Sequence, residues 1–149
     1  MDGYIENLYV NRELYSVLFE PVCSKYKLTL AEMLILIFLS KNTEYDTASD
    51  IVEQLKITKS HVSASVRDLS ERGYLEGSYE GHNHRTIHLR LCDRSMSVIK
   101  EGEHVQDKFL TVVSQGFTEE EKIRLKNYIQ RMNHNANQYL KACDNIKRR

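Results

Sequence analysis

The chain has 149 residues, enough for one domain with a substantial apolar core. It carries 21 basic and 21 acidic residues, so its formal net charge is zero, which excludes a strongly basic nucleic-acid coat. One proline and six glycines predict a mainly helical fold with few turns. No apolar stretch approaches the ~18 residues of a membrane span, and the first ten residues do not resemble a signal peptide.

Three cysteines, Cys23, Cys92 and Cys143, lie far apart in the chain. Their odd number and wide spacing indicate reduced thiols, as in a cytoplasmic protein. We therefore expect a cytoplasmic chain without a membrane partner.

The first 28 residues predict a helix with more apolar surface than a solvent-facing helix needs. Asp2 is its expected N-cap, and Pro21 is expected to kink or end it. Thr29 then caps a second helix, with Glu32 completing a capping box. The body of that helix, MLILIFLS, is apolar nearly all round and should be buried.

Two further helices follow after a turn. Thr47 caps a short third helix with Asp50 in a second capping box, and Thr58 caps a fourth. The fourth helix has one apolar stripe, formed by Val62, Val66 and Leu69. Two helices joined by a short turn, with a polar outer face, are typical of a helix-turn-helix.

The outer face of the fourth helix carries short, polar or basic side chains and no acid. Arg67 suits a bidentate contact with guanine or phosphate, and Lys59 suits phosphate. The alternative is an ordinary solvated helix face. The candidate DNA-binding residues on this helix are Thr58, Lys59, Ser60, His61, Ser63, Ala64 and Arg67.

A two-stranded ribbon is expected after this helix. Gly73 ends the helix, and the strands Tyr74–Glu80 and Arg85–Leu91 flank a turn of four residues, 81–84. The segment from residue 81 to 92 again has no acid. A small-faced helix beside a basic-tipped hairpin favours DNA recognition in and beside the major groove.

Two long helices should complete the chain, the first ending near Gln115 before Gly116 and the second capped by Thr118. Spare apolar surface at both chain ends predicts a homodimer interface, although these helices could instead cover the central domain of a monomer. The expected segments are an N-terminal dimerisation helix (1–28), a DNA-binding domain (29–92) and C-terminal dimerisation helices (93–149).

The stretches LTLAEMLILIFL, ASDIVEQLKITKSHVSASVRDLSERGYLE and NHRTIHLRL resemble the MarR (multiple-antibiotic-resistance) family of regulators. The order of elements matches over about the whole chain. The resemblance implies a winged helix-turn-helix fold, mainly α with a small two- or three-stranded β wing. It also implies an obligate dimer whose recognition helices enter two consecutive major grooves, and often a small ligand or oxidant that releases DNA.

The wing departs from the family pattern. Where the family carries an acid and two arginines, this chain has Asn83, His84 and Arg85, and Cys92 replaces a usual threonine. Wing contact by His84 should be weaker, or tuned by its protonation. Arg85 either contacts DNA or braces Asp68, which matches the family's recognition-helix acid.

The histidines and cysteines suggest two other functions, metal binding and redox sensing. His82, His84 and His88 suggest a metal ligand set, but no zinc motif accompanies them, so no metal site is expected. Cys23, with Lys25 and Lys27 nearby, is the candidate for a redox-sensitive thiol.

No catalytic constellation is present in the sequence, so neither an enzyme nor a cofactor is expected. The predicted function is a transcriptional repressor that binds double-stranded DNA as a homodimer on a near-palindromic operator. A small aromatic or amphipathic effector, or thiol oxidation, would release it. The alternatives are a winged-helix module that binds protein, and a metal-responsive regulator that uses the wing histidines.

Overall fold

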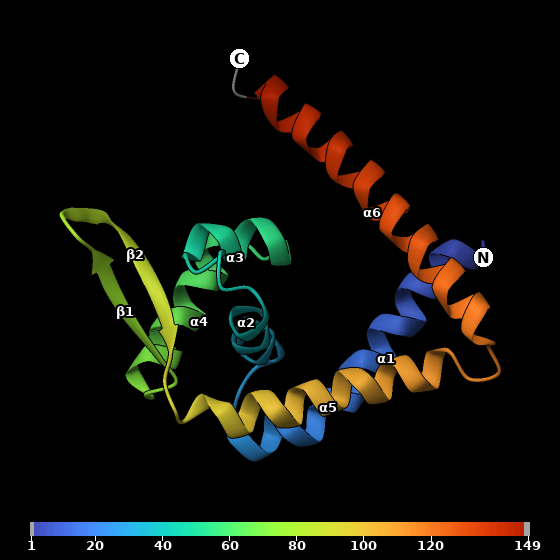
Figure 1. Cartoon of the computed structure of the whole chain (residues 1–149), viewed down its shortest axis with the longest axis horizontal. Helices are drawn as coiled ribbons and strands as arrows, with labels where there is room; N and C mark the ends of the chain where they lie inside the picture. Colours follow the sequence, from blue (N-terminus) through green and yellow to red (C-terminus); the bar gives the residue numbers. More distant parts are fainter. Residues whose placement is uncertain (1, 148–149) are drawn as a thin grey trace. The chain divides into compact units, whose positions relative to one another are not determined.

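Within residues 2–147 the fold consists of six helices and one two-stranded sheet (Figure 1). The structure is a computed structural model that describes these residues, apart from the side chains at positions 83, 84 and 145–147. This arrangement confirms the expected mainly helical fold with a small β wing. In chain order the elements are α1 (Gly3–Tyr26), α2 (Leu30–Lys41), α3 (Ala48–Leu55), α4 (Lys59–Glu71), β1 (Leu75–Glu80), β2 (Asn83–Leu91), α5 (Ser95–Val113) and α6 (Glu119–Lys147).

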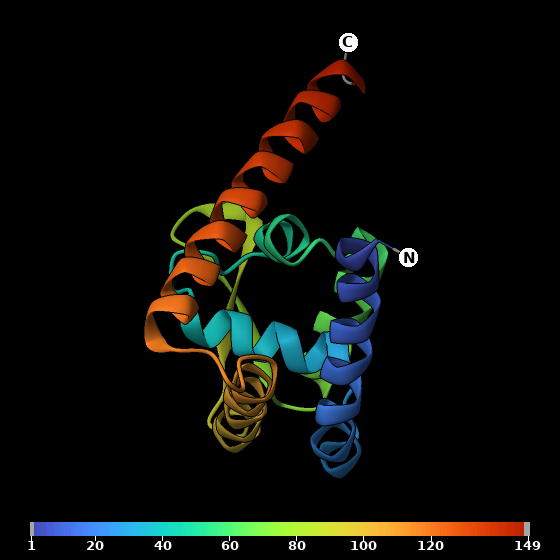
Figure 2. The same ribbon diagram turned by 90° about the vertical axis from the view of Figure 1, so that its right-hand side faces the viewer.

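The chain forms two compact units, one up to Phe109 and one from Leu110 onward. The first contains α1 to α4, the sheet and most of α5. The second contains the end of α5 and the whole of α6. Figure 2 shows α6 as one unbroken helix. None of the helices described combines the length and the apolar character that a membrane crossing requires.

Side-chain caps begin the central helices where the sequence predicts them. The Thr29 hydroxyl accepts a hydrogen bond from the Glu32 amide (3.2 Å), and the Glu32 carboxylate accepts one from the Thr29 amide (2.8 Å). Thr47 and Asp50 form the same reciprocal pair at α3. These bonds satisfy amides that have no partner inside the helix. The expected caps of the terminal helices are also confirmed, at Asp2 and Thr118.

The first helix continues through Pro21 and ends at Tyr26. The alternative in which Pro21 ends the helix is therefore wrong. Proline removes one N–H, which in a helix would donate to the carbonyl four residues earlier, at Val17. Both residues are exposed, so water can satisfy that carbonyl. The helix ends instead where Lys27 adopts a left-handed conformation (φ 54°).

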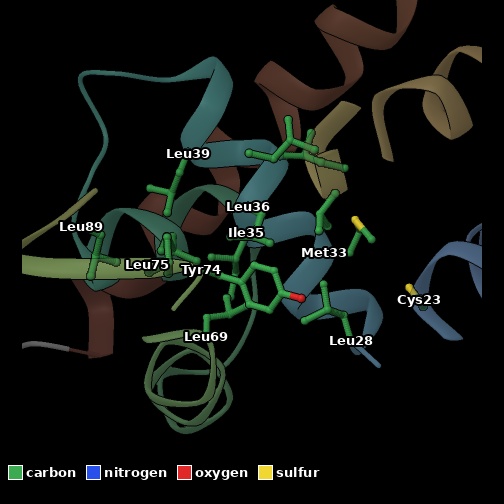
Figure 3. Close-up of a cluster of buried hydrophobic side chains, with 14 of the residues drawn as sticks. Cys23, Leu28, Met33, Ile35, Leu36, Leu39, Leu69, Tyr74, Leu75 and Leu89 are labelled. Atoms are coloured by element: carbon green, nitrogen blue, oxygen red, sulfur yellow. The ribbon is translucent and has the colours of Figure 1, made fainter. Parts of the chain in front are cut away.

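The second helix lies at the centre of the apolar core, as its sequence predicts. Met33, Ile35 and Leu36 are completely buried. Figure 3 shows their side chains among residues from α1, α4 and the sheet, including Cys23, Leu69, Leu75 and Leu89. Because α2 is covered on several sides, the surrounding elements are positioned by their apolar contacts with it.

The fifth helix approaches α2 closely at Gly102. A Cβ atom at this position would lie 2.7 Å from Ile37 Cδ1 and 2.9 Å from Met33 Sδ. Both of those side chains are buried, so neither has open space into which to move. The absence of a side chain at Gly102 therefore sets the separation of the two helices.

The sheet is an antiparallel hairpin with one irregularity. Strand pairing runs from Leu75 opposite Leu91 to Tyr79 opposite Ile87, and then shifts so that Glu80 lies opposite Asn83. Residues 84–86 form a bulge between the last two pairs. The expected four-residue turn is wrong, because β2 begins at residue 83 and only residues 81 and 82 form the turn. A single bridge between Thr47 and His88 joins the hairpin to the start of α3.

Gly102→Val should lower the free energy of unfolding by about 1–3 kcal/mol, since its methyl groups would overpack the contact between α2 and α5. Urea denaturation followed by circular dichroism measures this change. Gly3→Val is the control, because a Cβ at Gly3 meets nothing within 4 Å. Equal stability of the two variants would contradict the close approach at Gly102.

Candidate nucleic-acid interface

The fourth helix begins after a short connection from α3. The third helix ends where Lys56 adopts a left-handed conformation (φ 55°). The Thr58 hydroxyl then accepts a hydrogen bond from the His61 amide (3.4 Å), which starts α4. The inner side of α4 is buried, and its buried residues are Val62, Ser65 and Leu69. Ser65 was not singled out from the sequence, although it lies three residues after Val62 on the same side of the helix.

The opposite side of α4 is exposed to solvent. Ser60, Ser63, Ala64 and Arg67 recur at helical spacing, so they share one face. The side chains are short in the middle of this face, while Lys59 and Arg67 are longer. All the candidate residues of the helix are exposed, namely Thr58, Lys59, Ser60, His61, Ser63, Ala64 and Arg67.

This face is electrostatically positive. Between Thr58 and Arg67 there are two cationic side chains and no carboxylate. The first carboxylate of α4 is Asp68, which forms an ion pair with Arg72 (Nη1 to Oδ2, 3.1 Å). The first turn of α4 also contains no acid, so the positive end of the helix dipole is not offset by a side chain there.

The positive charge and the short side chains of this α4 face are suited to binding a grooved polyanion such as a nucleic-acid duplex. Helix N-termini and basic side chains bind phosphate oxygens, while short side chains allow a helix to approach base edges. The face has the chemistry required to bind the backbone of a duplex and to contact its bases.

The end of α4 is joined to the end of α1 by Arg72. Its guanidinium binds Asp68 and also donates to the carbonyl oxygens of Tyr26 (2.7 Å) and Lys27 (2.8 Å). Desolvation lowers the pKa of Arg72, but the hydrogen bond and charge of Asp68 outweigh it and leave that pKa raised. The structure thus gives Asp68 a partner, Arg72, that the sequence interpretation had not assigned. The four-residue spacing in RDLSER was the available signal.

Arg72→Met should lower the free energy of unfolding by about 1–2 kcal/mol, because two carbonyls and one carboxylate lose their donor. Arg124→Met is a matched control, since Arg124 pairs with Glu120 at the same spacing (3.2 Å) but is far more exposed. Denaturant titration compares the two variants. A similar loss in both would show that Arg72 acts only as a surface ion pair.

The wing presents His82 and Arg85 to solvent. The predictions for the side chains of Asn83 and His84 lie outside the described residues. The predicted contact of Arg85 with DNA stays a prediction. The other predicted role of Arg85, as a brace for Asp68, also stays a prediction, although Asp68 already forms an ion pair with Arg72. Arg90 lies further along β2, with its guanidinium 4.0 Å from Glu76.

His88 connects the wing to the loop between α2 and α3. Its Nδ1 atom lies 2.8 Å from Asp46 Oδ1, and its Nε2 atom lies 3.8 Å from Glu80 Oε2. The hydrogen bond with Asp46 is the main cause of a raised pKa of His88. The Leu89 amide donates to the Asp46 carbonyl (2.7 Å), so Asp46 contacts β2 through both backbone and side chain. His88 thus faces the carboxylates of Asp46 and Glu80.

The structure opposes a redox role for Cys23. Cys23 is 8% exposed, and burial raises the pKa of its thiol, with the charges of Glu20 and Glu32 raising it further. Lys25 binds Glu101 (2.6 Å) instead of activating the thiol. Reactive cysteines require both access and a lowered pKa, so this environment disfavours Cys23 as the sensor, and its redox role stays a prediction.

Cys23 should react with a disulfide reagent on the order of tenfold or more slowly in the folded chain than in urea, because its thiolate is disfavoured and covered. Mass spectrometry after timed labelling resolves each cysteine. Cys143, which is partly exposed on α6, is the internal comparison. Labelling of folded Cys23 at the unfolded rate would support it as a sensor.

A helix-turn-helix followed by a two-stranded wing defines this protein as a winged helix-turn-helix protein. Residues 26–85 match the model of the MarR family. The chain is 25% identical over 115 residues to the HTH-type transcriptional regulator BilQ of Clostridioides difficile (strain CD3), an alignment that covers 77% of this chain and 75% of BilQ.

Two solved structures share the fold over most of their length. A MarR family transcriptional regulator from Listeria monocytogenes, complexed with 26mer DNA, has a TM-score of 0.83 at 17% identity and covers 93% of this chain and 91% of its own. Bordetella bronchiseptica BpsR, whose DNA binding is regulated by 6-hydroxynicotinic acid, has a TM-score of 0.71 at 17% identity and covers 89% and 99%. Together with the family model, these matches show that the chain resembles MarR-type transcriptional regulators in sequence over residues 26–85 and in fold over most of its length. The proteins it matches are regulators rather than enzymes.

Proposed function

We propose that this protein is a cytoplasmic repressor that binds a near-palindromic DNA operator as a homodimer and is released by a small aromatic or amphipathic effector. The observation that carries the proposal is the exposed, acid-free face of α4, with short side chains between Lys59 and Arg67. The regulator from Listeria monocytogenes with the same fold is complexed with DNA, which supports this use of the fold. In this proposal α4 enters the major groove and the wing, through His84 and Arg85, lies beside it.

The proposed dimer rests on apolar side chains that stay exposed on the terminal helices. On α1 they include Tyr4, Leu8, Tyr9 and Val17, and on α6 they include Ile123, Tyr128, Ile129, Met132, Tyr139 and Leu140. Large apolar surfaces on a helix are typical of interaction sites. A second copy of the chain is the partner that two-fold DNA half-sites favour, and segments 1–28 and 93–149 would form that interface.

Release by an effector would act on the distance between the two recognition helices. Arg72 binds the carbonyls of the last turn of α1 and the side chain of Asp68 on α4. A shift of α1 in the dimer would therefore be passed to α4 through this contact. The regulation of BpsR by a small aromatic acid supports an effector of that class. A ligand achieves this only if it binds the two dimer states with different affinity.

Arg67→Ala should weaken specific DNA binding by about 1–3 kcal/mol, or roughly fivefold to 150-fold, because it removes a base or phosphate contact. Fluorescence anisotropy measures this at moderate salt, with the palindrome found beside the protein's own gene. Lys100→Ala is the control, since Lys100 is an exposed cation on α5. An unchanged affinity of Arg67→Ala would remove this residue from the interface.

The second candidate, a winged-helix module that binds protein, is tested by the salt dependence of the same titration. DNA binding should weaken steeply and linearly in log affinity against log salt, because contacts with phosphates release counterions. The absence of binding to any palindrome at low salt would favour the protein-binding module. The acid-free α4 face is the reason for preferring DNA.

A further inference from the structure

Three ligand-type side chains from separate segments converge between the wing and the core. Asp46 lies in the loop between α2 and α3, Glu80 ends β1, and His88 lies in β2. Each offers one oxygen or nitrogen atom, and these atoms all lie within 4.8 Å of one another. They line a cavity of about 590 Å³ that other polar residues, such as Ser40 and Asn42, also line. An ion and its remaining water ligands would therefore fit beside them.

The backbone holds two of these groups in place without help from the side chains. The Leu89 amide donates to the Asp46 carbonyl (2.7 Å), and the bridge between Thr47 and His88 lies next to it. As a result Asp46 and His88 are neighbours through main-chain contacts on both sides. Preorganised ligands of this kind reduce the cost of closing a metal site.

The third group is adjustable. Glu80 lies at the register shift of the hairpin, and its side chain is 74% exposed. Its carboxylate is already 3.8 Å from His88 Nε2. Zinc bonds to nitrogen and oxygen of ~2.0–2.2 Å imply tetrahedral ligands about 3.4 Å apart. Asp46 faces Nδ1 of the imidazole and Glu80 faces Nε2, and one ion can use only one of these nitrogens. An ion on Nδ1 would replace the hydrogen bond with Asp46 and move that oxygen outward from 2.8 Å, while rotation of the exposed Glu80 side chain would bring its carboxylate to the same ion.

We propose that Asp46, Glu80 and His88 bind one divalent transition-metal ion at the base of the wing. One imidazole and two carboxylates form a mixed ligand set that suits Zn²⁺, with water in the fourth position. Mg²⁺ and Ca²⁺ prefer oxygen ligands alone, and Cu²⁺ and Ni²⁺ favour nitrogen-richer square-planar sites. This site differs from the histidine cluster considered from the sequence, since His88 is its only histidine.

The bound ion would connect three segments that the chain otherwise joins by hydrogen bonds. Glu80 and His88 belong to the two wing strands, and Asp46 belongs to the loop that precedes α3. The metal would therefore fix the wing on the helix-turn-helix, whichever macromolecule the outer surface binds.

Isothermal titration of chelator-treated protein with Zn²⁺ alone tests the site. We expect one ion per chain, and at least about tenfold weaker binding in Glu80→Gln, since loss of even an outer-shell partner typically costs 10–100-fold. Glu80→Gln leaves the hydrogen bond between Asp46 and His88 in place, so it separates metal binding from folding. His88→Ala should also lose the ion.

Two control variants match the test residues. Glu76→Gln removes another exposed glutamate of β1, and His82→Ala removes another exposed histidine of the hairpin. Both should bind Zn²⁺ like the original chain, and Zn²⁺ should raise the melting temperature of both by more than that of Glu80→Gln. Unsaturable or absent binding by the original chain, or equal binding by Glu80→Gln, would overturn the proposal. The result does not depend on DNA binding.

Discussion

The two sides of α4 have opposite requirements, and the rest of the structure depends on meeting both. The inner side must bury Val62, Ser65 and Leu69 against the core, and the outer side must remain free for its partner. A helix that turned by one residue would bury Ser63 or expose Val62. The apolar contacts with α2 and α3 therefore determine which side chains are presented outward. The fold is in this sense a support for one helix face.

The polar contacts at the edges of the helix-turn-helix complement this apolar support. Arg72 holds the end of α4 against the end of α1, and Asp46 holds β2 against the loop before α3. Both contacts join segments that are more than forty residues apart, so both form only in the folded chain. They give the terminal helix and the wing each a direct physical link to the recognition unit. An effector or a metal ion could change the position of the helix-turn-helix only through links of this kind.

Much of this architecture could be predicted from local sequence patterns. The capping boxes at Thr29 and Thr47 and the apolar run of α2 depend on residues within one or two helical turns, and the structure confirms them. The exposed face of α4 also follows from its periodicity. These features are predictable because the same short segment contains both the signal and the interaction that produces it.

The features that the sequence did not reveal depend on contacts between distant segments, or on local surroundings that tolerate an unfavourable residue. Arg72 binds carbonyls 45 and 46 residues away, which no periodic pattern encodes. The burial of Cys23 is a property of the packed core, which its neighbouring lysines do not reveal. Pro21 is tolerated inside α1 because its position is exposed. The hairpin turn is shorter than expected because a bulge extends β2 to residue 83.

In the proposed mode of binding, two copies of α4 read one duplex together. Analytical ultracentrifugation of the protein with a labelled duplex that contains the whole palindrome measures how many chains bind. The account predicts two chains per duplex, bound together without a populated one-chain complex, and much weaker binding to a duplex with one half-site. A single chain bound to the half-site as tightly as to the whole palindrome would contradict it.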